Sequence, residues 1–133
     1  MKPFDLHLQG TAKHEHITGV TSFVGQDDSG SFGILPGHAR MLTVLAYGLA
    51  RFRDASGTWT YLALPGGVLY FADNALTITT RRYFLDTRYG EISTTLLDQL
   101  LSEEAALRMV KENIYRLEQE MLRRLWQIER GAP

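Results

Sequence analysis

Histidine is the residue type in this chain whose spacing comes nearest to a reactive site. The four histidines are His7, His14, His16 and His38. If the triplet His14-Glu15-His16 lies in a strand, both imidazoles fall on one face, and paired imidazoles can bind zinc. A closed zinc site needs two further ligands, and the chain has no cysteine to supply them. We therefore expect no metal site and interpret the triplet as the exposed start of a strand.

The usual signatures of catalysis and phosphate binding are missing from the sequence. It contains no Gly-x-Ser-x-Gly elbow, no P-loop and no Gly-x-Gly-x-x-Gly stretch. The adjacent carboxylates Asp27-Asp28 and Glu103-Glu104 are explained more simply as turn and helix-start residues. We therefore predict no catalytic residue and no cofactor, and the sequence does not indicate a free-standing enzyme.

The segment Gly30–His38 is apolar inside a frame of glycines. Phe32, Ile34 and Leu35 stand where a turn would ordinarily be polar. A glycine-rich loop that displays apolar side chains is a candidate docking surface. These side chains can equally fold back into a core. Both interpretations remain open on the residues alone.

The composition is that of an ordinary globular protein. The chain has 133 residues, 44% hydrophobic and 22% charged, with a net charge of −1. This balance does not favour nucleic-acid binding, and the absence of cysteine excludes disulfides. No run of 18 apolar residues occurs, so we expect no membrane span and a soluble protein of the cytoplasm.

Glycine and proline divide the chain into two parts. Eleven of the twelve glycines lie at or before Gly90, and neither residue type occurs from 91 to 130. Short alternating apolar segments separated by turn residues predict an antiparallel β-sandwich, or a barrel, over residues 1–87. In this part only His38–Leu45 resembles a helical turn. We predict a helical domain over 93–131, either a hairpin or one long helix, with a cap among Ser93–Thr95 and another at Ser102.

The second part carries an apolar stripe and a ladder of charges at helical spacing. The ladder alternates in sign at every fourth residue from Glu104 to Arg124, which supports a helix that stays folded while it changes partners, or simply a solvated face. The stripe steps by three or four residues and consists of Leu107, Val110, Ile114, Leu117, Met121, Leu125 and Ile128.

At this point the residues indicate a family. The segment Gly30-Ser31-Phe32-Gly33-Ile34-Leu35-Pro36-Gly37-His38-Ala39, with the later Leu64-Pro65-Gly66-Gly67-Val68-Leu69, resembles the epsilon subunits of rotary F-type ATP synthases. The resemblance covers about residues 3–80. The tail around Met121–Trp126 looks more like the epsilon subunits of the alternate, often sodium-linked F-type ATPases.

The resemblance implies a non-catalytic rotor subunit at the foot of the central stalk. Its sandwich would bind the gamma subunit and, through the bottom loop, the ring of c subunits. Its tail would pack on the sandwich or extend along gamma, and in bacteria this change can restrain ATP hydrolysis. The complex lies at the cytoplasmic face of the bacterial inner membrane. The ion, proton or sodium, is set by the c subunit.

Particular residues follow from this resemblance. The stripe from Leu107 to Ile128 would be the packing face of the tail, and Arg123, Arg124 and Arg130 would reach the alpha/beta catalytic head. The residues expected to face the c-ring are Ser31, Phe32, Ile34, Leu35, His38 and Arg40.

Two departures from the family pattern bear on function. Ser31 replaces a frequent acidic residue and Arg40 a usual proline, so the ring contact would use different polar partners. The ATP-binding pattern Ile/Leu-Asp-x-x-Arg-Ala begins correctly at Leu85-Asp86, but Arg88 comes one residue early and no alanine follows. We therefore do not expect regulatory ATP binding.

Two other classes of protein fit the same residues. A β-sandwich adaptor with a helical self-association module would use the near-heptad stripe to form a homo-oligomer. A metal-dependent enzyme would be built around His7, His14 and His16. The adaptor needs fewer assumptions than the enzyme.

Overall fold

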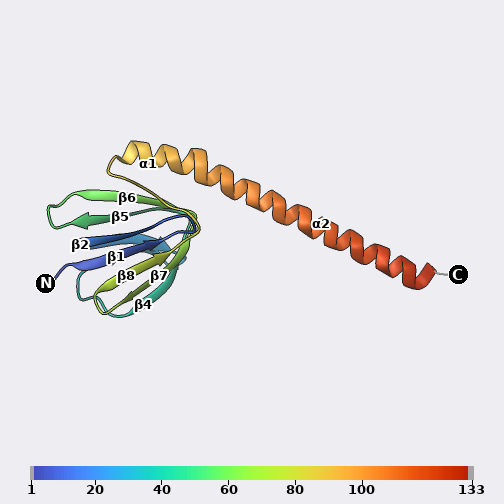
Figure 1. Ribbon diagram of the computed structural model, residues 1–133, viewed down its shortest axis with the longest axis horizontal. Coiled ribbons are helices and arrows are strands. Elements are labelled where there is room, and N and C mark those ends of the chain that lie inside the picture. Colours follow the sequence, from blue (N-terminus) through green and yellow to red (C-terminus); the bar gives the residue numbers. More distant parts are fainter. Residues whose placement is uncertain (1, 132–133) are drawn as a thin grey trace. The chain divides into compact units, whose positions relative to one another are not determined.

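The computed structural model describes residues 2–131, with side chains as far as Ile128. Over this range the chain forms a strand-rich part followed by helix (Figure 1). The strands are β1 (Phe4–Gln9), β2 (His14–Asp27), β3 (Gly30–Ile34), β4 (Met41–Leu45), β5 (Gly48–Asp54), β6 (Trp59–Leu64), β7 (Gly67–Ala72), β8 (Ala75–Thr79) and β9 (Phe84–Asp86). The helical elements are α1 (Tyr89–Thr95), a π-helical turn η1 (Leu96–Leu100) and α2 (Leu101–Gly131).

Strand β2 joins the two layers of the sandwich. The strand order is β4-β7-β8-β1-β2-β5-β6-β9, and β3 pairs with β2 beside this path. The first half of β2 pairs with β1, and its second half pairs with β3 and β5. The registers with β1 and β5 both shift near Val20, next to Gly19 at φ 75°. This irregularity lets the strand bend from one layer into the other, and β2 lies between β1 and β5 in Figure 1.

One strand pair differs from the antiparallel expectation. Strands β1 and β8 run parallel, with Leu6 opposite Leu76. A second difference concerns His38–Leu45, where the helical turn that we expected is wrong. Met41–Leu45 forms strand β4 against β7, because only an extended chain lets it complete the ladder.

The core lies between the two layers. Alternate residues of β1 point into it, which gives the strand its buried Phe4, Leu6 and Leu8. The Phe4 and Phe71 rings meet edge to face at 5.4 Å between centroids. Side chains from β1 through β8 therefore share one apolar cluster.

Two turns show why the sequence needs its small or amide residues where they lie. The β7–β8 hairpin turns through Asp73 and Asn74, both with positive φ (51° and 59°), as a type I′ turn requires. Gly67 begins β7 so close to β8 that an added Cβ would lie 2.5 Å from the Thr79 carbonyl oxygen. The hairpin and the close approach at Gly67 fix β7 against β8.

The helical region begins earlier than the expected caps. Helix α1 starts after Arg88, and the Asp86 carboxylate accepts a hydrogen bond from the Arg88 backbone N–H at 2.8 Å. Thr94 and Thr95 instead bond back to carbonyls four residues earlier. The cap that we predicted among Ser93–Thr95 is therefore wrong, and so is the one at Ser102, which lies inside continuous helix.

The chain divides into two compact units, one ending at Leu100 and the other beginning at Leu101. In the first unit Ile92 and Leu100 pack with Ala63 in a second apolar cluster on the outer side of β6. The second unit is the single long helix α2, so within residues 2–131 the long-helix alternative holds and the hairpin does not. No helix in this range has the length and apolar character needed to cross a membrane.

Candidate docking surfaces

The segment between β3 and β4 forms a tight, anchored turn. The His38 backbone N–H donates to the Leu35 carbonyl at 3.1 Å, and Gly37 has φ 80°. The Gly37 N–H donates to Asn74 Oδ1 at 2.9 Å. Asn74 Nδ2 in turn donates to the carbonyls of Lys2 and Pro3. The turn is therefore held to the β7–β8 hairpin and to the start of the chain.

The residues expected to face the c-ring do not all lie on the surface. Ser31, Leu35, His38 and Arg40 are exposed, and Leu35 is 60% exposed. Ile34 is the exception, because its side chain is 0% exposed and belongs to the core. The alternation of β3 requires this, since a strand next to the core turns every second side chain inward.

Phe32 and His38 each have a partner beneath them. Phe32 is half-buried, with its ring centroid 6.4 Å from that of Phe23. The His38 ring stands edge-on to the buried ring of Phe71 at 5.9 Å. Phe32 therefore partly follows the alternative interpretation of the glycine-framed segment, in which its side chains fold back into the core.

An apolar surface that the sequence analysis missed lies beside this turn. Leu42 and Val44 of β4 stand opposite Tyr70 and Val68 of β7, and all four side chains are exposed. Leu42 is 69% and Val44 67% exposed. We name these four residues the β4–β7 face. The signal was present in Met41–Leu45, where both alternating sets contain apolar residues, so one set has to face outward.

The β1–β2 ladder brings together two of the three histidines of the metal hypothesis. His7 lies opposite His16, and their rings stack at 4.3 Å between centroids. His14 pairs instead with Gln9. Among the described residues, the third side chain that can share a metal with this pair is Asp5.

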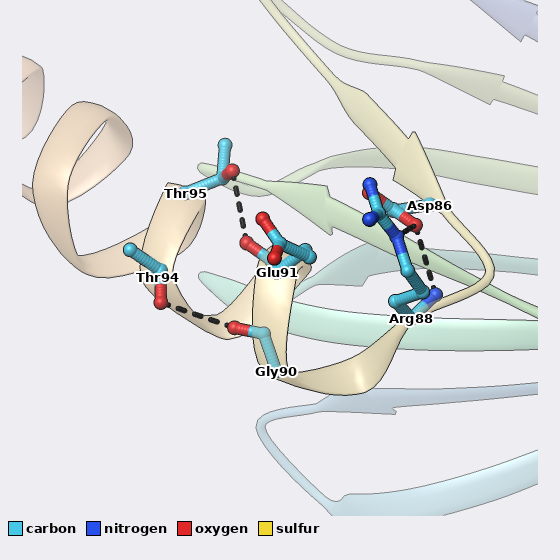
Figure 2. A network of polar contacts seen from close by, with 6 residues as sticks. All are labelled: Asp86, Arg88, Gly90, Glu91, Thr94 and Thr95. Atoms are coloured by element: carbon cyan, nitrogen blue, oxygen red, sulfur yellow. Dashed lines mark hydrogen bonds and ion pairs between the residues drawn. The ribbon is translucent and has the colours of Figure 1, made fainter.

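The joint between sandwich and helix is held by a pair of opposite charges (Figure 2). The Asp86 carboxylate accepts hydrogen bonds from the Arg88 backbone N–H at 2.8 Å and from Arg88 Nε at 3.3 Å. The backbone bond, and after it the side-chain bond, lower the pKa of Asp86, and the same carboxylate raises the pKa of Arg88. These two positions of the ATP-like segment therefore bind each other and secure the start of α1.

The predicted packing face of the tail is exposed along α2. Every member of the stripe from Leu107 to Ile128 has an exposed side chain. Arg123 and Arg124 lie 3.9 and 3.7 Å from Glu120 Oε1. The side chain of Arg130 lies outside the described residues. Pairs this exposed add little stability, which leaves these arginines able to exchange partners at small cost.

The sandwich and its exposed faces define a class of protein. Residues 12–85 match the family model described as "ATP synthase, Delta/Epsilon chain, beta-sandwich domain". This match covers more than half of the chain and includes the anchored turn and the β4–β7 face.

Curated relatives specify the member of this class. The chain is 33% identical over 116 residues to the ATP synthase epsilon chain 2 of Cereibacter sphaeroides, covering 86% of this chain and 80% of that one. It is 38% identical over 76 residues to the ATP synthase epsilon chain of Streptomyces coelicolor, covering 56% and 61%. The chain belongs to the ATP synthase epsilon chain family.

Solved structures agree with the fold. A chain of the Euglena gracilis mitochondrial ATP synthase (OSCP/F1/c-ring) aligns with a TM-score of 0.60 and 19% identity, covering 64% of this chain and 54% of that one. A chain of the Tetrahymena thermophila enzyme (central stalk/c-ring) gives 0.53 and 21%, covering 63% and 69%. The predicted family and the sandwich followed by a long helix are confirmed, and the unrelated adaptor is not favoured.

Proposed function

We propose that this chain connects the gamma subunit to the c-ring through two different surfaces of one sandwich. The observation that carries the proposal is the β4–β7 face, an exposed apolar patch next to an anchored turn. Exposed apolar patches on small domains usually mark contact sites. The complex would hold the chain peripherally, at the cytoplasmic face of a bacterial inner membrane.

The β4–β7 face is the proposed gamma-binding surface. Complete burial of a Leu or Val side chain is worth about 1.5–3 kcal/mol. The four side chains of the face retain 41–69% of their exposure. Covering them would therefore contribute roughly 1 kcal/mol each, before the entropic cost of association is subtracted.

The turn between β3 and β4 is the proposed contact with the c-ring. Leu35 supplies an apolar tip and His38 and Arg40 supply polar groups in the turn, while Ser31 lies near the other end of β3, opposite Gln26 of β2. Phe32 and Ile34 support the turn from below and the ring contact does not include Ile34. The bonds to Asn74 hold the turn in one conformation, which suits a contact that has to bear load.

The two surfaces can be tested separately by copurification with gamma and by cross-linking to the c-ring. Leu42→Ser with Val44→Ser should abolish copurification with the gamma subunit of the same organism. Thr79→Ser, in β8 on the same outer side of the sheet as the β4–β7 face, should leave copurification intact.

Because the chain has no cysteine, Ser31→Cys and His38→Cys give single sites for cross-linking to the ring, with Thr58→Cys in the β5–β6 turn as control. Gamma binding that survives the double substitution would contradict the assignment of the β4–β7 face, and ring cross-links from Thr58→Cys alone would contradict that of the turn.

The helix α2 is the proposed regulatory element. Its apolar stripe would pack on gamma or on the sandwich, and Arg123, Arg124 and Arg130 would contact acidic groups of the alpha/beta head. Replacing all three arginines with alanine should raise ATP hydrolysis by the reassembled complex. Lys111→Ala, elsewhere on α2, is the matched control. Unchanged hydrolysis in the triple variant would contradict the regulatory contact.

Gel filtration of this chain with the gamma subunit tests the alternative hypothesis of a self-associating adaptor. A one-to-one complex of this chain with gamma in gel filtration supports the stalk assignment. A chain that elutes alone as a homo-oligomer and ignores gamma would support self-association through the stripe of α2.

A further inference from the structure

The outer surface of the β1–β2 ladder gathers three side chains with metal-binding atoms. Asp5 and His7 lie two residues apart on β1, so they share a face, and His16 stands directly across the ladder from His7. The register of the ladder shifts between Phe4 and Leu6, at the position of Asp5. The extra residue of this bulge lies on β2, between Ile17 and Val20, so Asp5 keeps the alternation of β1 and stays on the face of His7.

The spacing of these atoms approaches that of a metal site. His16 Nε2 lies 3.2 Å from Asp5 Oδ2. One nitrogen of each imidazole and one carboxylate oxygen all lie within 4.8 Å of one another. Ligands on a tetrahedral zinc, at bonds of about 2.0–2.1 Å, are separated by roughly 3.3 Å. The His16–Asp5 pair already has that separation, and His7 needs to move by at most about 1.5 Å.

An ion pair alone does not account for the arrangement. The His16 and Asp5 side chains are 52% and 47% exposed, and pairs this open contribute little stability. The His7 and His16 rings are also stacked, with 20° between their planes. The second imidazole brings a third ligand atom to the pair.

We propose that Asp5, His7 and His16 form a three-ligand site for a divalent transition metal of the zinc type. Two imidazoles and one carboxylate select such ions over magnesium or calcium, which prefer oxygen ligands. Water fills the fourth position. When the metal binds, both imidazoles coordinate it in place of stacking on each other, and the ion links β1 to β2. His14, which the sequence suggested as a ligand, lies opposite Gln9 and takes no part.

The site differs in place and chemistry from the surfaces of the proposed function. Across the same outer side of the sheet, Thr77 of β8 separates His7 from Tyr70 of the β4–β7 face. The metal would thus strengthen the middle of this layer while the apolar edge remains open to a partner. Its presence can be measured on the chain alone, without gamma or the ring.

Zinc chloride is the probe, titrated into the full chain made without a histidine tag and followed by calorimetry at neutral pH. We expect one zinc per chain. His7→Gln, His16→Gln and Asp5→Asn should each weaken binding at least about tenfold, since even the loss of an outer-shell partner costs 10–100-fold. His14→Gln and His38→Gln are the matched controls and should bind as the wild type does. Loss of binding in His14→Gln equal to that in His16→Gln would overturn the proposal, because it would show diffuse binding by surface histidines.

A second measurement keeps the proposal testable if a variant folds poorly. Zinc that binds the folded chain raises its melting temperature. The wild type and His14→Gln should show equal shifts, and His16→Gln should show a smaller one at the same zinc concentration. Cobalt bound at the site should give the visible absorption of a tetrahedral centre. A wild-type chain that shows no calorimetric binding, no shift and no such spectrum would refute the site.

Discussion

Asn74 connects three segments of the sandwich, so its replacement tests how the proposed ring-facing turn is held. Its Oδ1 accepts from the Gly37 N–H, and its Nδ2 donates to the carbonyls of Lys2 and Pro3. Its backbone has φ 59°, a conformation that glycine adopts freely and alanine does not. Asn74→Gly therefore removes the side-chain bonds without adding strain, and Asn74→Ala removes the same bonds and adds strain.

The expected cost follows from these contacts. A net hydrogen bond is worth about 0.5–1.5 kcal/mol, so losing the contacts of this partly exposed side chain should cost about 2 kcal/mol in Asn74→Gly. The left-handed backbone adds roughly 1 kcal/mol in Asn74→Ala. In a domain near 100 residues the glycine variant should melt about 8–16 °C lower.

Thermal and urea unfolding of the three chains measure these differences. Asn74→Asp is the matched third variant, because it keeps the acceptor for Gly37 and loses the donor to Lys2 and Pro3. It should lie between the wild type and Asn74→Gly. A glycine variant as stable as the wild type would refute the view that this amide holds the turn, and an aspartate variant as unstable as the glycine one would refute the role of Oδ1.

Three further predictions concern the sandwich. Gly67→Ala should lower the free energy of unfolding in urea by about 2 kcal/mol or more, because the added Cβ would lie 2.5 Å from the Thr79 carbonyl oxygen. Gly33→Ala is the control and should change the free energy little, because its Cβ would lie 3.8 Å from the Phe23 carbonyl oxygen. Hydrogen bonds from Ser56 and Thr58 lower the pKa of Asp54 below its ordinary 3.8, so the folded chain holds fewer protons there than the unfolded chain. The stability that Asp54 contributes is thus present above pH 3.8 and is lost as the pH falls through the folded pKa. In unfolding curves measured at acid pH, Asp54→Asn should therefore lose less stability as the pH falls than the wild type does. An unchanged pH dependence would contradict the role of Asp54. Burial, followed by the charge of Glu15, raises the pKa of Tyr83 to about 12. Within the described residues the buried Tyr83 hydroxyl has no hydrogen-bond partner, so Tyr83→Phe should change the free energy of unfolding by less than about 0.5 kcal/mol. A larger loss of stability would show that the hydroxyl is bonded.

The sequence predicted those features that depend on local pattern. Alternation and turn residues indicated the sandwich, and the freedom from glycine and proline after Gly90 indicated the helix. Which histidines lie side by side could not be predicted, because the register between two strands determines it. His14 and His16 share a face of their own strand, but only the β1–β2 ladder shows that His16 meets His7 and Asp5.

The sequence also could not show which side chains of the candidate docking surfaces are buried. Ile34 and Leu35 are adjacent and equally apolar, yet one is buried and the other exposed. The difference depends on which face of β3 meets the core. The exposure of Leu42 and Val44 was not predicted, because apolar residues in a strand usually indicate a core and the sequence does not show the proposed gamma contact.

Strand β2 has a mechanical consequence. Its 14 residues pass through both layers, so the layers share one covalent backbone as well as the side chains packed between them. A sideways force applied at the β4 edge would reach β5 and β6 along that backbone and its rows of hydrogen bonds, with little slippage of one layer over the other. A domain built this way twists as a single stiff block, which suits the proposed position between gamma and the c-ring.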